Sequence, residues 1–173
     1  LDADLATKAD LGEETYRGTG RLEGLRAIVT GADSGIGAAT AIAFAREGAD
    51  VVLSYLPQEE EDASRIAGII EAAGRKAVKV PGDLKDSATC RELVDTAVAV
   101  LGGVDILVNN AGKQVAQEDL QDITDEQFDH TLKTNVYAMF WVTKAAVPHM
   151  PAGSTIVNTT SIQAYNPSRS EER

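Results

Sequence analysis

Thr30-Gly31-Ala32-Asp33-Ser34-Gly35-Ile36-Gly37 is the stretch that decides the fold, because it joins an apolar run at 27–29 to a segment with helical spacing. Gly31 permits a sharp turn, Gly35 removes a Cβ where a phosphate must approach the backbone, and Gly37 lets the helix pack closely on the sheet. The N–H groups at a helix N-terminus attract anions. The stretch therefore predicts a dinucleotide-binding turn, with a simple tight turn as the alternative. Its candidate cofactor-binding residues are Gly31, Asp33, Ser34, Gly35, Ile36 and Gly37.

Strand-like and helical patterns alternate outward from this turn. A long helical pattern starts at Thr124-Asp125-Glu126-Gln127, which is typical of a capping box. The alternation predicts an α/β fold, a doubly wound parallel sheet (Rossmann fold) of five strands with helices on both faces. The continuous apolar strands favour a sheet covered on both sides. The expected strands are 27–30, 51–53, 77–80, 104–108 and 154–160, and the expected helices are 38–47, 59–73, 87–101 and 124–149.

Residues 1–22 are polar and aperiodic, which predicts an N-terminal arm that lies on the surface or is partly disordered. Residues 23–173 are then one dinucleotide-binding domain. The opening residues 1–4 lack the basic and apolar profile of a signal peptide. We therefore expect a cytoplasmic protein.

The composition excludes several classes of partner. Asp and Glu outnumber Lys and Arg by 27 to 16, and the net charge of −11 argues against nucleic-acid binding. The apolar run 136–142 is far shorter than the ~20 residues of a membrane span. His130 and His149 have no ligand-spaced partners, so no metal site is expected. Cys90 is alone and cannot form an internal disulfide; we expect it near the surface of a helix.

Three later motifs extend the signal of the glycine-rich turn. They are Asn109-Asn110-Ala111-Gly112, then Asn135, then Ser161. In order and spacing, the set resembles the short-chain dehydrogenase/reductase family from about residue 21 to residue 165, and the N-terminal arm resembles the extension of some bacterial members. The resemblance implies an NAD(P)-dependent oxidoreductase that transfers a hydride between a nicotinamide and a small-molecule alcohol or carbonyl substrate.

The resemblance also implies roles for single residues. Asn109, Ala111 and Gly112 would brace the sheet and line the adenosine ribose side of the cofactor groove, with a plain turn as the alternative. Asp83 and Leu84 would contact the adenine, although a structural Asx turn at Asp83 competes with that interpretation. In the family, the asparagine that Asn135 matches holds a helix distortion and a proton-carrying water. The serine that Ser161 matches hydrogen-bonds the reacting oxygen.

The end of the second strand bears on the choice between NAD and NADP. An acidic residue there would bond the ribose 2′-hydroxyl and repel a 2′-phosphate. The sequence has Ser54-Tyr55-Leu56-Pro57 instead, with Tyr55 as a cofactor-binding candidate. The acidic run 59–62 that follows is interpreted as a solvated helix start. NADP is therefore the expected cofactor, with NAD as the alternative, although the glycine-rich turn supplies no arginine for the phosphate.

Near its end, this sequence departs from the family's pattern. The family's acid/base tyrosine and the lysine four residues later follow the serine at a spacing that runs just past Arg173. We expect this pair to lie outside the sequence. The rival hypothesis is a truncated, catalytically silent nucleotide-binding or interaction module. A weaker one is a substitute site at Tyr165 and Arg169. The apolar segment 139–141 suggests core or subunit contact. Because members of the family often assemble through this helix, the resemblance implies a homo-oligomer.

Overall fold

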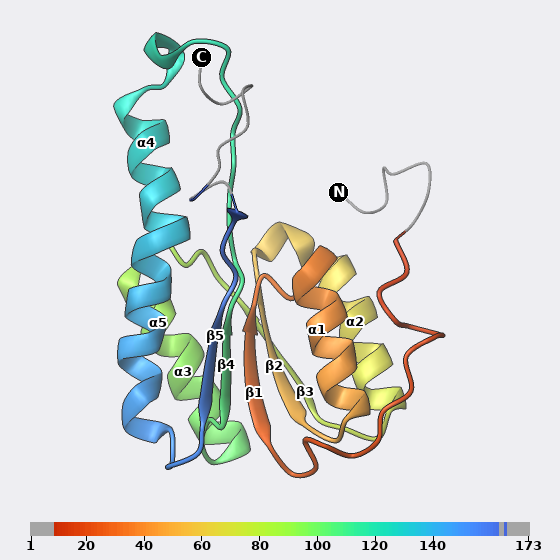
Figure 1. Ribbon diagram of the computed structural model, residues 1–173. Helices are drawn as coiled ribbons and strands as arrows, with labels where there is room; N and C mark the ends of the chain where they lie inside the picture. Colours follow the sequence, from red (N-terminus) through yellow and green to blue (C-terminus); the bar gives the residue numbers. More distant parts are fainter. Residues whose placement is uncertain (1–8, 163–164, 166–173) are drawn as a thin grey trace.

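A five-stranded parallel sheet forms the centre of the molecule (Figure 1). The computed structural model describes residues 9–162 and residue 165. The strand order is β3-β2-β1-β4-β5, and every neighbouring pair is parallel. This arrangement confirms the predicted fold class. The strands are β1 (Arg26–Thr30), β2 (Asp50–Tyr55), β3 (Ala77–Pro81), β4 (Ile106–Asn109) and β5 (Thr155–Asn158).

Helices cover both faces of the sheet. One apolar core lies between the sheet and α1 and α2, and a second lies between the sheet and α3 and α5 (Figure 1). Successive side chains of β1 point to opposite faces of the sheet, so Val29 packs in the first core and Ile28 in the second. The helices are α1 (Gly35–Arg46), α2 (Glu60–Ala72), α3 (Ser87–Leu101), α4 (Asp125–Leu132) and α5 (Ala138–Ala146), with 3₁₀ turns at Pro57–Glu59, Leu120–Asp122 and Val147–His149.

The expected long helix over 124–149 is interrupted. A π-helical turn, Lys133–Tyr137, separates α4 from α5. Thr124 caps α4 by accepting a hydrogen bond from the Gln127 amide at 3.1 Å. The Gln127 side chain donates to the Val115 carbonyl at 3.2 Å, so it holds the preceding loop instead of closing the capping box.

Helix α1 begins three residues earlier than the apolar spacing predicts. Its first turn contains Gly35 and Gly37, and glycine is a poor helix former, so the pattern shows helical character only from Ala38 onward. β5 also departs from expectation. All four of its residues are exposed, and among the described residues no strand pairs with its outer edge.

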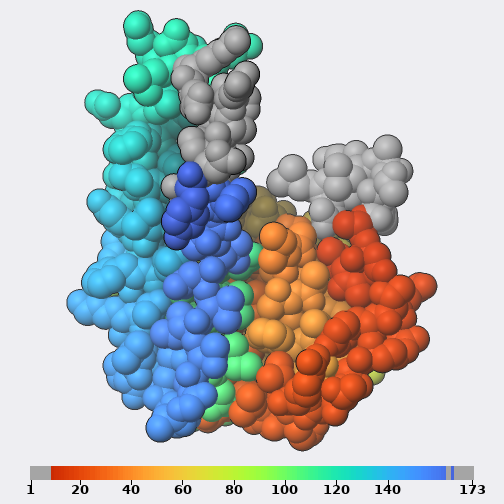
Figure 2. Space-filling view, viewed as in Figure 1, coloured from red at the N-terminus to blue at the C-terminus, as the bar shows by residue number. Residues whose placement is uncertain are grey.

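The N-terminal segment 9–25 lies against α1 and passes around its C-terminal end (Figures 1 and 2). Leu11 is buried in the core beneath α1 and α2. The carboxylate of Glu47, at the end of α1, anchors the segment. It accepts hydrogen bonds from the Tyr16 hydroxyl, from the Thr19 amide at 2.9 Å and from the Arg21 side chain at 2.6 Å.

The position of Cys90 differs from the prediction that it lies near the surface of a helix. Its side chain is fully buried in the core beside α3, not near the surface, and its thiol donates to the Leu84 carbonyl at 3.2 Å. Burial raises the pKa of this thiol to about 11. Over the described residues, no helix is both long and apolar enough to cross a membrane.

Candidate functional site

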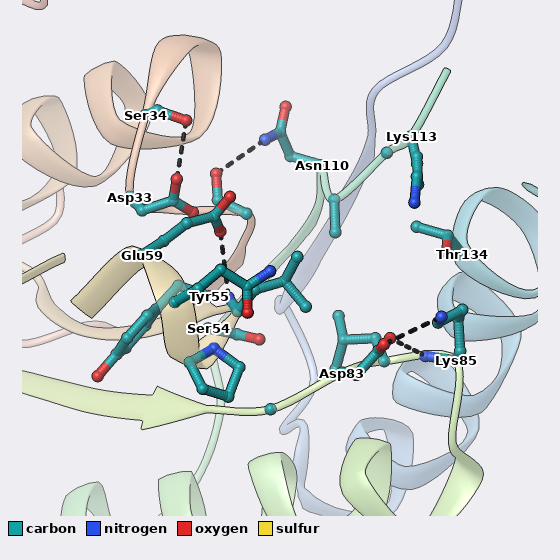
Figure 3. A pocket seen from close by; sticks show the side chains of 18 of the residues that line it. Asp33, Ser34, Ser54, Tyr55, Glu59, Asp83, Lys85, Asn110, Lys113 and Thr134 are labelled. Carbon is teal, nitrogen blue, oxygen red and sulfur yellow. Dashed lines mark hydrogen bonds and ion pairs between the residues drawn. The ribbon is translucent and has the colours of Figure 1, made fainter. Parts of the chain in front are cut away.

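A cleft with a volume of about 700 Å³ opens at the carboxyl ends of the strands (Figure 3). The loops that follow β1, β2, β3 and β4 all contribute to its lining. β1 and β4 are neighbours in the sheet although two strands separate them in the chain, so the cleft lies where the strand order reverses. Ligands of open α/β sheets bind at such a switch point.

The glycine-rich turn forms one wall of the cleft. Gly31 and Gly35 have φ angles of +63° and +52°, which favour glycine. A Cβ on Gly37 would lie 1.9 Å from the Gly31 carbonyl oxygen, whereas one on Gly35 would meet no atom within 4 Å. Gly37 therefore allows close packing within the protein, and Gly35 leaves open space beside the backbone. Gly31, Asp33 and Ser34 line the cleft.

Two adjacent asparagines connect the central strands. Asn109 is buried, and its amide donates to Asn158 at 2.9 Å and to Thr143 at 3.1 Å. It holds β4 to β5 and α5 and does not line the cleft. Asn110 does line the cleft, and its amide donates to the Thr30 carbonyl at 3.2 Å.

The turn after β3 has the geometry of an Asx turn and also borders the cleft. Asp83 accepts a hydrogen bond from the Lys85 amide at 3.0 Å, the geometry of an Asx turn, and it also lines the cleft (Figure 3). The Lys85 ammonium lies 3.2 Å from the Asp83 carboxylate. Leu84 is buried and reaches the same cleft. Tyr55 lines it too, although its hydroxyl is committed to Glu60.

Two carboxylates meet in the wall between the turn and the end of β2. The side chains of Asp33 and Glu59 lie next to one another (Figure 3), and both residues line the cleft. Asp33 is buried and accepts a hydrogen bond from the Ser34 hydroxyl at 2.8 Å. Burial, and then the charge of Asp33, raise the pKa of Glu59 above its ordinary value.

The π-helical turn carries Asn135. Its side-chain oxygen accepts from the Lys113 amide at 2.7 Å, and its nitrogen donates to the Lys113 carbonyl at 2.8 Å. Asn135 therefore clamps the loop that follows β4, while Thr134 and Lys113 line the cleft beside it (Figure 3). π-helical turns in α-helices are frequent at functional sites.

Ser161 lies beyond the end of β5, is exposed, and is not among the residues that line the cleft. Tyr165 is 89% exposed, and its suggested partner Arg169 is outside the described residues. No cluster of three or more His, Cys, Asp or Glu side chains suited to a metal ion occurs among the described residues.

Sequence reasoning missed several residues that line the cleft. Asn110 lies within the motif 109–112 but was not among its candidate cofactor-binding residues, although an amide side chain can both donate and accept hydrogen bonds between neighbouring loops. Glu59 was assigned to a solvated helix start. The Pro57 that opens its 3₁₀ turn is the signal that the chain folds back at this point. Lys85, Lys113 and Thr134 carried no pattern that distinguished them.

Comparisons with known proteins agree with this geometry. The family model described as short chain dehydrogenase matches residues 26–171. An uncharacterized oxidoreductase of Escherichia coli, YghA, is 55% identical over 168 residues, which cover 97% of this chain and 57% of the relative. The chain thus spans a little over half the length of this curated relative.

Two solved structures are similar in fold and sequence. A short chain dehydrogenase of Burkholderia cenocepacia in complex with NADP has a TM-score of 0.83 and 42% identity, covering 86% of this chain and 60% of that one. A blue fluorescent protein from a metagenomic library, in complex with NADPH, has a TM-score of 0.81 and 38% identity, with the same coverage. With the family model matching most of its length, the chain belongs to the short chain dehydrogenase family.

Proposed function

We propose that the chain binds NADP in the cleft at the carboxyl ends of β1 to β4, with NAD as a second ligand that the same cleft can accommodate. The observation that carries the proposal is the glycine-rich turn at the strand-order reversal, with open space beside Gly35. Two structurally similar proteins have NADP or NADPH bound. This support concerns those proteins, and direct binding to this chain is the test.

The lining of the cleft fits a dinucleotide. A pyrophosphate needs backbone N–H groups and room to approach them, and the first turn of α1 offers both. A Cβ on Gly35 would enter that room. Ser34 does not use its side chain to cap α1 and donates to Asp33 instead. A cavity of about 700 Å³ is within the range of cofactor sites.

Each wall of the cleft then has a distinct role in holding the cofactor. The turn holds the pyrophosphate, while Asp83 and Leu84 bind the adenine and Tyr55 flanks the adenosine. The loop after β4 lines the remaining side, with Asn109 acting from behind it by bracing the strands. The residues proposed to touch or support the cofactor are Gly31, Asp33, Ser34, Gly35, Ile36, Gly37, Tyr55, Asp83, Leu84, Asn109, Ala111 and Gly112.

We also propose that the whole protein is an oxidoreductase acting on a small alcohol or carbonyl compound. The nicotinamide supplies or accepts the hydride when bound. Asn135 holds the loop after β4 through Lys113 and would support proton movement beside it. Ser161 would hydrogen-bond the reacting oxygen of the substrate. Turnover of an alcohol or aldehyde that is lost in Ser161→Ala tests this role; binding without turnover supports the silent-module alternative.

The test of cofactor binding is a fluorescence titration with NADPH and NADH. Wild type should bind at least one of them. Gly35→Val should lose most of that affinity, because its side chain would occupy the open space and because a φ of +52° disfavours valine; circular dichroism checks that the variant keeps its fold. Gly68→Ala, an exposed position in α2 with no atom near an added Cβ, is the matched control and should bind as wild type does. Wild type that binds neither cofactor at millimolar concentration would overturn the proposal.

We further propose a homo-oligomer formed through the α4–α5 face. Large apolar side chains are exposed along it, with Phe128 59%, Val136 52% and Phe140 60% exposed. Exposed apolar side chains that recur on one helical face mark association surfaces. Sedimentation should show a larger species for wild type than for Phe140→Glu, and equal masses would count against this surface.

A further inference from the structure

We propose that Glu59 is a specificity-determining residue of the cleft, and that its carboxylate beside Asp33 disfavours a 2′-phosphate on the bound dinucleotide. The inference rests on the proposed function: NADP still binds in the cleft, but more weakly than it would beside an uncharged side chain at position 59. It goes beyond that function by assigning the discrimination to one side chain outside the family motifs. It also revises the expectation that no acidic group flanks the cofactor's adenosine end.

The position of Glu59 follows from local chain geometry. β2 ends at Tyr55, and the Pro57–Glu59 turn folds the chain back before α2 starts at Glu60. The Glu59 carboxylate accepts a hydrogen bond from the Leu56 amide at 3.3 Å, which holds it over the end of the strand. A carboxylate therefore stands at the carboxyl end of β2, although it comes four residues after the strand's last residue.

This end of the second strand is where dinucleotide-binding folds recognise the adenosine ribose. A carboxylate there accepts a hydrogen bond from a 2′-hydroxyl and repels a 2′-phosphate, whereas an arginine accommodates the phosphate. The residues of this wall that line the cleft, from Ser54 to Glu59, include no arginine or lysine. Asp33 faces Glu59 from the glycine-rich turn and adds a second negative charge (Figure 3).

One further acidic side chain adds to the negative charge around Glu59. Asp62, from the first turn of α2, also acts on Glu59 with a negative charge. Glu60 is already paired with Lys79 and Tyr55. The two lysines of the cleft lie elsewhere: Lys85 is paired with Asp83, and Lys113 stands beside Thr134 across the cleft (Figure 3).

The test compares the dissociation constants of NADPH and NADH for three proteins: wild type, Glu59→Gln and Glu61→Gln. Glu61→Gln is the matched control because it makes the same change in net charge. Glu61 lies two residues further along, is exposed and does not line the cleft. We expect Glu59→Gln to tighten NADPH binding about fivefold, the effect of removing one nearby unit charge in partly screened surroundings. NADH binding should stay the same or weaken, and Glu61→Gln should change neither.

A second measurement tests the charge itself. Protonation makes Glu59 resemble glutamine, so the difference in NADPH affinity between wild type and Glu59→Gln should shrink as the pH falls from about 8 to about 5. The cofactor's 2′-phosphate also takes up a proton over this range. Because the repulsion needs the Glu59 charge, this protonation lowers it in wild type alone and shrinks the difference in the same direction.

Three results would overturn the inference. They are NADPH affinity that Glu59→Gln and Glu61→Gln change equally, NADPH affinity that Glu59→Gln lowers, and a difference from wild type that does not depend on pH. Wild type that binds neither cofactor is a separate result, because it refutes the proposed function itself. Circular dichroism of each variant checks that the fold is retained.

Discussion

Gly37→Ala should damage the junction between β1 and α1 severely. The added Cβ would lie 1.9 Å from the Gly31 carbonyl oxygen and 2.7 Å from the Asn110 side-chain nitrogen. Ordinary contact needs roughly 3.5 Å, so the start of α1 or the loop after β1 must move by about 1.5 Å. Both neighbours are held in place, because Asn110 also donates to the carbonyls of Thr30 and Gly31.

The expected cost combines two effects. Overpacking a tight contact costs about 1–3 kcal/mol. Weakening the Asn110 hydrogen bonds adds up to about 1 kcal/mol. Gly37→Ala should therefore lower the free energy of unfolding by about 1–4 kcal/mol. It should weaken dinucleotide binding as well, because the displaced turn is the proposed site of the pyrophosphate.

Urea unfolding followed by circular dichroism measures this cost. Gly68→Ala is the matched control, because its Cβ meets no atom within 4 Å and alanine is the better helix former. It should raise the free energy of unfolding by about 0.5–1 kcal/mol. A free energy of unfolding for Gly37→Ala within about 0.5 kcal/mol of the wild-type value would refute this reasoning, because it would mean that the loop moves aside at little energetic cost.

Three further predictions concern single side chains. Hydrogen bonds from Arg21 and then Tyr16 hold the pKa of Glu47 well below its usual range. The ionised Glu47 carboxylate therefore adds to the free energy of unfolding above the ordinary carboxyl pKa of about 4.3, and this stabilisation is lost as the pH falls below that value. The urea midpoints of wild type and Glu47→Gln should converge in acid. Constant separation down to about pH 2 would contradict this. Cys90, fully buried and with its pKa raised to about 11, should react with a thiol reagent only in denaturant; labelling of the folded protein would contradict its placement. Asn109→Ala removes the donor to two side chains and should lower the free energy of unfolding by about 1–3 kcal/mol, measured in urea; an unchanged value would show that the bridge is dispensable.

Where local pattern and tertiary structure agree, the sequence predicted the fold well. Helix α3 was predicted with its observed bounds because Asp86 caps its start, accepting from the Ala88 amide, and Gly102 ends it with a φ of +85°. The break at the π-helical turn has no comparable signal, because apolar residues keep nearly the same spacing through it. Only the resemblance implied a distortion near Asn135.

The conformation of the glycine-rich turn was predictable from the sequence, whereas residues that reach the cleft through tertiary contact were missed. The roles of Gly31, Gly35 and Gly37 follow from what a Cβ would do to a turn, so they can be inferred locally. Glu59 joins the cleft only because a 3₁₀ turn brings it beside Asp33. Cys90 did carry a signal that was overlooked: it shares the helical face of Leu93 and Val94, both buried.

The link from Asn110 to Thr30 has a kinetic consequence. The two residues that form this hydrogen bond are 80 positions apart in the chain. The pairing of β1 with β4 joins residues that are about equally far apart. During synthesis, β1, β2 and β3 can pair while β4 is still to be made. The glycine-rich turn, which we propose as the pyrophosphate site, therefore reaches its final conformation late. Its backbone is synthesised early, but the turn is held in place only once Asn110 forms its hydrogen bonds. A nascent chain should gain affinity for the cofactor abruptly at that point, well after its first strands have paired.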